Sequence, residues 1–358
     1  MKSPVCCQWL TQVVACIAAA LLCSAPACAD YKGQMIVFPE VLLPQNSKQT
    51  PPLEQQVSSV AVNFFYTAAY QQTRLLAELL ADGEERDLER LAVGWVSPQG
   101  SQIWFGRLHS ALDPWNRKYH HGAYLQTTIY RPGLIEFEDS GGVIPAHLTG
   151  AVVEAAYEDA GYITHYTLNV GLGPELTPGY IKALDVLHPQ EGDYKLSIVS
   201  AISRHNIDAI FDDSGLYAGY VQIPSSVSGI TDVTQKIFGG YINTSLRAWH
   251  LSLSATWIDL RLDLTSGDNK SEGFGYAYLQ PEYWLNHDWI LYGRSEGSYQ
   301  GQTSLFLQQL PGFVRHRNLA GARYQLSGNQ ALKFELASMD QFGRRFNQVA
   351  LQWSAALP

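Results

Sequence analysis

Residues 249–257 read Trp-His-Leu-Ser-Leu-Ser-Ala-Thr-Trp, a strict alternation of apolar and polar side chains. Successive side chains of a β-strand point to opposite faces, so the pattern predicts a strand with one apolar and one polar face. Trp249 and Trp257 end the apolar face, and a tilted strand of this length rises roughly 20 Å, about the height of the apolar band of a transmembrane β-barrel. Indole rings favour the headgroup zones of a bilayer, so we expect both tryptophans to lie there. Leu253 would then face lipid, and Ser254 would face a water-filled lumen.

Similar alternation runs through the rest of the chain. Val349, Leu351 and Trp353 share one face near its end. Two weaker segments, 33–43 and 134–139, would raise a count of about 16 strands to about 18, and bacterial barrels have even numbers. The sequence therefore predicts an all-β fold, a transmembrane antiparallel β-barrel of about 16–18 strands. The 16 clearer segments are 57–66, 74–81, 89–96, 102–109, 122–130, 147–157, 162–170, 193–203, 207–222, 235–245, 248–257, 273–284, 288–296, 317–326, 330–338 and 347–357.

The lengths of the connections assign them to the two sides of the membrane. Outer-membrane barrels have short periplasmic turns and longer external loops. We expect 327–329 to be a short turn and 223–234 and 262–272 to be long loops. The segment 110–121 lies on the periplasmic side if there are 16 strands and on the external side if there are 18.

Two alternatives concern fold type. The segment 73–90 is rich in helix-forming residues, but Asp82-Gly83 in its middle favours a hairpin. A soluble periplasmic β-sandwich or propeller would also alternate apolar and polar residues. We favour the barrel because its polar faces carry small groups suited to a wet lumen and its apolar faces end in aromatic residues.

Composition agrees with an exported barrel. The formal net charge of −9 argues against binding to nucleic acid. The chain holds 20 Tyr, 13 Phe and 9 Trp although only 16% of its residues are charged. After the first 29 residues no uninterrupted apolar run approaches the length of a membrane-spanning helix.

The beginning of the chain resembles an export signal. Lys2 precedes an apolar run, and Ala27-Cys28-Ala29 fits a small-x-small cleavage site. We expect residues 1–29 to be a cleavable signal peptide and residues 30–358 to be a single outer-membrane barrel. A lipoprotein anchored through Cys28 is the alternative. All five cysteines would be lost with the signal, so we expect neither a disulfide nor a thiolate metal site. They are Cys6, Cys7, Cys16, Cys23 and Cys28.

These features together resemble Gram-negative outer-membrane porins. The final strand, with Val349, Leu351 and Trp353, is similar to the strand that the barrel-assembly machinery reads in that group, although its aromatic residue stands before the end. Further stretches look like porin-like proteins without an assigned solute. They are Phe105-Gly106-Arg107, Pro114-Trp115-Asn116, His120-His121-Gly122, Arg131-Pro132, 138–142 and 315–321. The resemblance implies an outer-membrane barrel that acts as a diffusion channel, and it names no solute.

Charged residues on predicted inward faces, or in the connections between strands, are candidates for tuning a pore. His120 and His121 are adjacent, so on a strand they would point to opposite faces, and we expect no metal site and no cofactor. The pore-lining candidates are Glu154, His250, Glu282, Arg294, Arg323, Lys333 and Glu335. The constriction-loop candidates are Arg117, Lys118, His120, His121, Glu136, Glu138 and Asp139. The aromatic girdle would hold Trp249, Trp257 and Trp353.

The sequence favours a passive outer-membrane diffusion channel for small polar or charged solutes. The acidic net charge predicts a mild preference for cations, which Arg117 and Lys118 could reverse. The alternatives are a plugged or structural barrel with a partner-binding role and an outer-membrane barrel hydrolase. We expect no enzyme, because no nucleophile-elbow sequence is present. Expected partners are outer-membrane lipid and lipopolysaccharide, the barrel-assembly machinery, small polar solutes and other copies in a homotrimer, but no nucleic acid.

We predict that the mature protein fractionates with the outer membrane and contains no free thiol, because every cysteine precedes Ala29. A thiol-reactive label should leave the purified protein unmarked. Labelling of the mature chain, or its recovery in the soluble periplasm, would refute the assignment.

Overall fold

The computed structural model describes residues 31–47, 58–83, 86–119, 122–136, 142–184, 186, 189–209, 211–341 and 344–358. Within these residues, 16 strands form one closed antiparallel barrel, as the sequence predicts. The barrel strands are β1 (Tyr31–Asn46), β2 (Ser59–Tyr70), β3 (Thr73–Ala81), β4 (Arg86–Val96), β5 (Gln102–His109), β6 (His147–Asp159), β7 (Tyr162–Leu172), β10 (Leu196–Asn206), β11 (Asp213–Pro224), β12 (Ile230–Leu246), β13 (Trp249–Leu264), β14 (Asn269–Trp284), β15 (Trp289–Tyr299), β16 (Val314–Ser327), β17 (Gln330–Gln341) and β18 (Arg344–Ala355).

The remaining elements are short. In the described part of the chain, no helix is long and apolar enough to cross a membrane. The short elements are the hairpin of β8 (Glu175–Thr177) and β9 (Tyr180–Lys182), and the helical turns α2 (Pro114–Lys118), η2 (Ala123–Leu125), η3 (Pro189–Glu191), η4 (Gly301–Thr303) and α3 (Leu305–Gln308).

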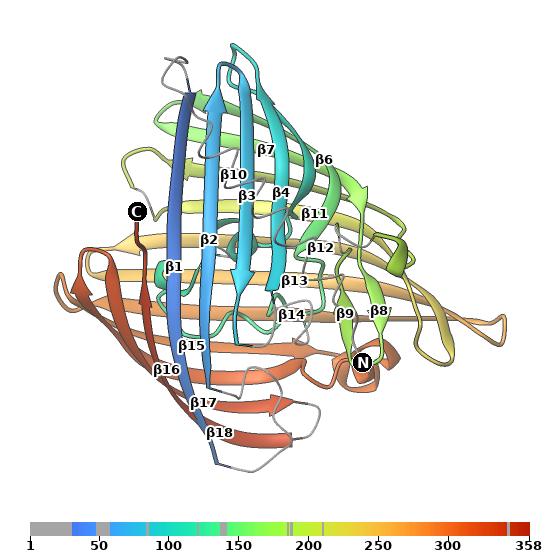
Figure 1. Ribbon diagram of the computed structural model, residues 1–358. Coiled ribbons are helices and arrows are strands. Elements are labelled where there is room, and N and C mark those ends of the chain that lie inside the picture. The colour runs from blue at the N-terminus through green and yellow to red at the C-terminus, as the bar shows by residue number, and fades with distance from the viewer. Residues whose placement is uncertain are drawn as a thin grey trace, which may run out of the picture.

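The two ends of the barrel differ in their connections. Figure 1 shows β1–β4 upright and alternating in direction in the near wall, with the later strands crossing behind them, and β1 closes the ring against β18. One end holds the start of β1 and short turns such as 160–161 and 328–329. The other end holds the long connections 110–146 and 173–195. Because the long connections of such barrels are external, we assign the second end as external.

The observed strands differ from the predicted ones at four segments. In the predicted strand 207–222, β11 begins only at Asp213. The weaker segment 33–43 is the full strand β1, although it contains Pro39. This proline lies just before the ladder with β18 begins, so its missing N–H removes no bond from that ladder. The prediction of a strand at 122–130 is wrong, because this segment contains η2 and an irregular stretch. Residues 134–136 also form no strand, and 137–139 lie outside the described residues.

The predicted connections are partly confirmed. The segment 73–90 is a hairpin of β3 and β4. Residues 110–119, the described part of the segment 110–121, continue from the external end of β5, as the larger strand count required. The long loops expected at 223–234 and 262–272 are short turns, because β11, β12, β13 and β14 continue further than the sequence pattern indicated.

The outer face of β13 carries the predicted apolar belt. Trp249, Leu253 and Trp257 are 52%, 44% and 39% exposed. Leu253 lies opposite Ile242 of β12 and Leu279 of β14, which are also exposed. A contiguous apolar surface of this kind requires a cover of lipid or protein. Together with the closed ring, it identifies a membrane-spanning barrel.

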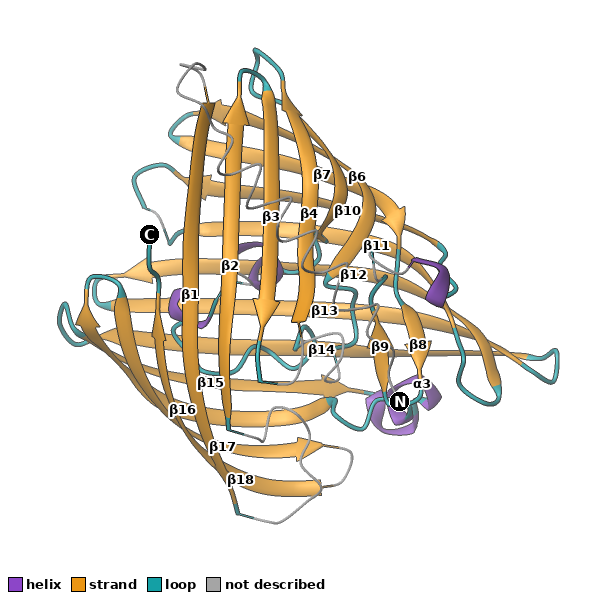
Figure 2. Cartoon of the chain, in the orientation of Figure 1, coloured by secondary structure: helices purple, strands orange, loops and turns teal. Residues whose placement is uncertain are grey.

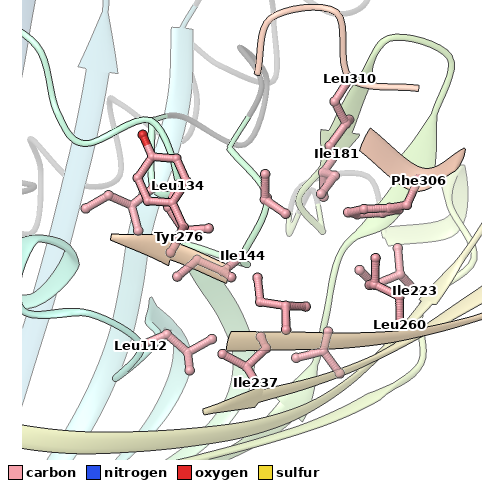
Figure 3. Close-up of a cluster of buried hydrophobic side chains, with 14 of the residues drawn as sticks. Leu112, Leu134, Ile144, Ile181, Ile223, Ile237, Leu260, Tyr276, Phe306 and Leu310 are labelled. Carbon is pink, nitrogen blue, oxygen red and sulfur yellow. The ribbon is translucent and has the colours of Figure 1, made fainter. Parts of the chain in front are cut away.

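The alternation on β13 reverses beyond Trp257. Asp259 and Arg261 point outwards, whereas Ile258 and Leu260 point inwards and are buried. The external part of the strand has therefore left the apolar zone. Its inward side chains join an apolar cluster inside the barrel, beside β11–β14 (Figure 3). Other members of the cluster are Leu112, Leu134, Ile144, Ile181, Ile223, Ile237, Phe306 and Leu310.

Ser254 points inwards, as predicted, but it does not face water. It is 2% exposed, and its hydroxyl donates a hydrogen bond to Asp113 Oδ2 at 3.0 Å. The prediction fails because a segment that is distant in the sequence covers this wall. Its neighbour Ser252 is inward and only half-buried.

We predict that Leu253→Arg impairs barrel assembly far more than Ser252→Arg. A lipid-facing arginine near the bilayer midplane costs about 2–4 kcal/mol, whereas an arginine at the inner face can reach water. Heat-modifiable mobility on gels measures the folded fraction. Equal losses in the two variants would contradict the assignment of the faces.

Candidate functional site

The described parts of the connection 110–146, residues 110–119, 122–136 and 142–146, enter the lumen, and Figure 2 shows their short helical turns inside the ring of strands. We call this connection the inner segment. Asn116 Nδ2 donates hydrogen bonds to the carbonyl oxygens of Ser110 and Ala146, at 3.0 and 2.8 Å. Because these two residues lie at the two ends of the segment, the contacts close its base beside β5 and β6.

Asp113 attaches the inner segment to the wall at β11 and β13. Its Oδ1 accepts a hydrogen bond from the Trp115 N–H at 2.9 Å, which caps α2. Its Oδ2 accepts from Ser254 at 3.0 Å and from the Tyr217 hydroxyl at 3.4 Å. The backbone of Asp113 has a φ of 63°, a left-handed conformation that residues other than glycine rarely adopt. Burial raises the pKa of the Asp113 carboxyl to about 6, although these hydrogen bonds oppose the shift.

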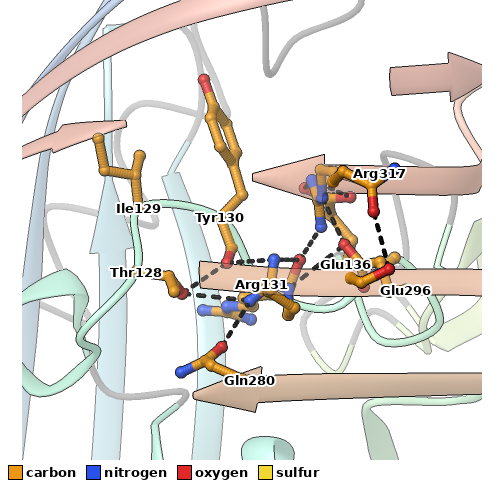
Figure 4. Close-up of polar contacts among 12 residues, drawn as sticks. Thr128, Ile129, Tyr130, Arg131, Glu136, Gln280, Glu296 and Arg317 are labelled. Carbon is orange, nitrogen blue, oxygen red and sulfur yellow. Dashed lines mark hydrogen bonds and ion pairs between the residues drawn. The ribbon is translucent and has the colours of Figure 1, made fainter. Parts of the chain in front are cut away.

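Four buried charged residues hold the inner segment against the neighbouring wall at β15 and β16. We call them the wall network: Arg294 and Glu296 of β15, Arg317 of β16 and Glu136 of the inner segment (Figure 4). Arg317 Nη1 lies 3.2 Å from Glu136 Oε1, and Arg317 Nε contacts Glu296. Arg294 Nε lies 3.4 Å from Glu296 Oε1. Buried charges are costly unless they are paired, so this arrangement specifies one position of the segment.

The wall network also satisfies main-chain groups of the inner segment. Arg294 Nη2 donates to the carbonyl oxygens of Tyr130 and Arg131, at 2.8 and 2.9 Å. The Gly133 N–H donates to Glu296 Oε2 at 3.0 Å. An irregular backbone in a protein interior needs such partners, because no neighbouring strand supplies them. The charged side chains of the wall therefore supply the main-chain hydrogen-bond partners that a neighbouring strand would have supplied to a strand at 122–130.

Five of the seven predicted pore-lining residues point inwards but are covered by the inner segment. Lys333 Nζ donates to the Thr128 carbonyl oxygen at 3.2 Å, and Glu335 Oε2 accepts from the Ile129 N–H at 3.0 Å. Lys333 and Glu335 are 0% and 1% exposed. The five residues that bind groups within 126–131 are Glu282, Arg294, Arg323, Lys333 and Glu335. Their charges fix the segment and do not face an open passage.

A cavity of about 610 Å³, lined by both charged and apolar side chains, lies on the other side of the inner segment, against β3–β7 and β10–β12. Glu154 of β6 and the helix residues Arg117 and Lys118 line it. Lys118 Nζ lies 2.7 Å from Asp213 Oδ2. Arg117 Nη1 lies 3.5 Å from the Ser203 hydroxyl. The structure thus brings residues of both predicted sets, pore-lining and constriction-loop, into one space.

The other predicted site residues lie elsewhere. His250 is near the periplasmic end of β13, where Nδ1 is 3.1 Å from the Ser245 hydroxyl and the ring packs edge-on against Phe211. Glu136 is part of the wall network. The described residues contain no group of three or more His, Cys, Asp or Glu that could hold a metal ion. His120, His121, Glu138 and Asp139 lie outside the described residues.

The girdle candidates occupy outward positions. Trp249 and Trp257 lie on the outer face of β13, and Trp353 is half-buried on the outer face of β18. Trp289 and Tyr324 form a further outward pair, with ring centroids 4.7 Å apart, that the sequence analysis missed. They stand at the periplasmic ends of β15 and β16. A comparison of the residues at the facing ends of adjacent predicted strands would have identified this aromatic pair.

Sequence reasoning also missed Asp113, Glu296 and Arg317. Glu296 ends the predicted strand 288–296 and Arg317 begins the predicted strand 317–326. Opposite charges at the facing ends of consecutive strands were an available signal for a pair. No pattern in the sequence, however, indicated that Glu136 would join them across the lumen.

Comparisons with known proteins show the fold. No family model and no curated protein matches the chain. Among solved structures, an anion-selective porin from Comamonas acidovorans is 12% identical with a TM-score of 0.59, over 91% of this chain and all of that one. OmpF of Salmonella typhi, in complex with daunomycin, is 10% identical with a TM-score of 0.57, over 92% and 98%. The outer-membrane channel DcaP of Acinetobacter baumannii is 9% identical with a TM-score of 0.56, also over 92% and 98%.

These similarities show that the chain has the 16-strand fold of outer-membrane porins. An outer-membrane location fits both this fold and the apolar belt.

We predict that Arg317→Met releases the inner segment without unfolding the barrel. Glu136 would lose the guanidinium that it binds, and breaking a buried pair in this way costs about 3–5 kcal/mol, while the strand ladders keep all their bonds. Limited proteolysis should therefore cleave within 110–146 although heat-modifiable mobility is retained.

Arg345→Met is the matched control for this variant. Arg345 also pairs with a carboxylate, at 3.3 Å from Asp340, but its side chain is 84% exposed. Exposed pairs contribute little, so this variant should resist protease like the wild type. Resistance of Arg317→Met equal to that of the control would show that the wall network does not hold the segment.

Proposed function

We propose that the protein is a passive outer-membrane diffusion channel for small polar or charged solutes. The observation that carries the proposal is the position of the inner segment. It is held against one wall by buried charges and leaves a cavity of about 610 Å³, lined in part by charged side chains, beside the other wall. A fixed narrowing lined by charged and polar groups selects solutes by size and charge.

The dimensions of the cavity support small solutes. Its volume lies within the range of about 300–1,000 Å³ that holds a small organic molecule. Charged, hydroxyl and imidazole groups line it, including Glu154, His165, Thr167 and Ser203. Such a lining can exchange hydrogen bonds with a hydrated solute. The names of the similar structures, a porin and a channel among them, support the same function by analogy of fold.

A plugged barrel with a structural or partner-binding role is the second candidate. The observation that favours it is the apolar cluster inside the barrel, where Leu112 and Ile144 pack with Ile237 and Leu260. A lumen closed by such a cluster would carry no current. A catalytic role has no comparable support, and we propose none.

The proposed partners follow from the membrane setting. Lipid and lipopolysaccharide would cover the belt, the barrel-assembly machinery would insert the chain, and a homotrimer would shield part of the outer face. Single-channel recording in a planar bilayer tests the channel itself. Discrete conductance steps are expected, and their absence would favour the plugged barrel.

The charges that face the cavity decide the ion preference. Glu282 and Glu335, on which the expected cation preference partly depended, are held by the inner segment. Arg117 and Lys118 instead share the cavity with Glu154 and Asp213. These opposite charges balance, so we expect little selectivity when histidines are neutral.

We predict that Arg117→Glu makes the channel cation-selective, because it replaces a positive charge in the cavity by a negative one. The reversal potential under a salt gradient should shift towards the cation equilibrium potential, and the shift should shrink as salt is raised. Arg261→Glu is the control, since Arg261 is exposed on the outer face of β13. Equal shifts in both variants, or none, would contradict the placement of Arg117 on the permeation path.

A further inference from the structure

Two histidines are stacked on the wall of the cavity. His165 of β7 and His205 of β10 have ring centroids 5.1 Å apart and an interplanar angle of 18°. Both line the cavity. Ser203 lies directly opposite His165 in the ladder, and its hydroxyl is the group that Arg117 reaches. The guanidinium of Arg117 therefore lies beside the two imidazole rings.

Each wall of the cavity contributes charged or titratable groups near this pair. Asp213 of β11 is the cross-strand neighbour of His205, and it is bound by Lys118 and by Asn243, whose amide donates at 2.7 Å. Glu154 of β6 and Tyr241 of β12 also face the cavity.

The remaining titratable groups of the lining are engaged with partners of their own. Arg90 of β4 is paired with Glu78 at 2.6 Å. His109 of β5 packs against His147, which lies 3.2 Å from Glu89. Protonation of the two stacked imidazole rings is therefore the change that most directly alters the net charge of the cavity lining.

Protonation of the stacked rings changes the character of the cavity. With neutral rings, Arg117 and Lys118 are balanced by Glu154 and Asp213. With both rings charged, two further positive charges lie close to Arg117. Two imidazolium groups at this distance repel one another, and an anion bound beside both would offset the repulsion. Histidine is the side chain whose charge ordinarily changes between pH 5 and pH 8.

We propose that His165, His205 and Arg117 form a binding site for small anions, occupied when the two histidines are protonated. The site rests on the proposed channel function and gives the channel a pH-dependent preference for anionic solutes. The fork of Arg117 suits an oxyanion, because its N–H groups match two acceptor oxygens. Proton uptake and anion binding favour each other by the same factor, as linkage requires.

The test compares the wild type with the double variant His165→Gln/His205→Gln at pH 5.5 and pH 8, in a gradient of potassium sulfate. Sulfate keeps its charge over this range. The sulfate-to-potassium permeability ratio of the wild type should rise on the order of three- to tenfold at the lower pH. The double variant should show the same ratio at both pH values. His287→Gln, which changes a histidine with a 92% exposed side chain in a periplasmic turn, should follow the wild type.

The outcomes separate the site from the channel. A conducting wild type whose ratio does not change with pH, or a double variant that keeps the change, overturns the anion site and leaves the channel standing. If no form conducts, the channel proposal fails, and calorimetric titration of the detergent-solubilised protein with sulfate decides the site. Binding that is several-fold tighter at pH 5.5 than at pH 8, and lost in the double variant, supports it. Binding that is absent, or unchanged by the substitutions, overturns it.

Discussion

The pairing of charges beneath the inner segment is the constraint on which the lumen depends. A barrel of 16 strands is wide enough to hold water, and nothing in the strand ladders decides how that space is used. Arg317 and Glu136 decide it, because each charge can be buried only in the presence of the other. The segment is thereby placed against β13–β18. The cavity on the opposite side is a consequence of that placement.

The two walls of the lumen therefore have different roles. On the wall that holds Arg294, Lys333 and Glu335, the charged side chains are buried and bind the backbone of the inner segment. The wall that holds His165 and Glu154 keeps its polar groups on an open cavity. An inventory of inward charges cannot tell these walls apart, although only one of them can interact with a solute.

The outer surface of the barrel was predictable from the sequence, and the inner arrangement was not. The lipid imposes the same rule on every strand, so the period-two pattern around Leu253 was enough to assign a face. Charged residues such as Arg117 and Glu154 could be chosen as candidates because the sequence pattern placed them in a connection or on a strand. The covering of Ser254 and Lys333 depends on a contact between segments far apart in the chain, which no local pattern contains. The segment 122–130 was misassigned for the same reason, since side chains of a distant wall bind its backbone.

The reversal of alternation on β13 has a consequence for how such chains are recognised. Up to Trp257 the odd-numbered side chains are apolar, and from Ile258 onwards the even-numbered ones are. In the language of periodic signals, the strand keeps its frequency but shifts its phase by half a cycle at the edge of the bilayer. A measure of amphipathicity averaged over Trp249–Leu264 adds two halves of opposite sign, and it would score a well-formed strand as featureless. The external boundary of the membrane is thus recorded in the sequence as a phase shift, visible only to a window shorter than the strand.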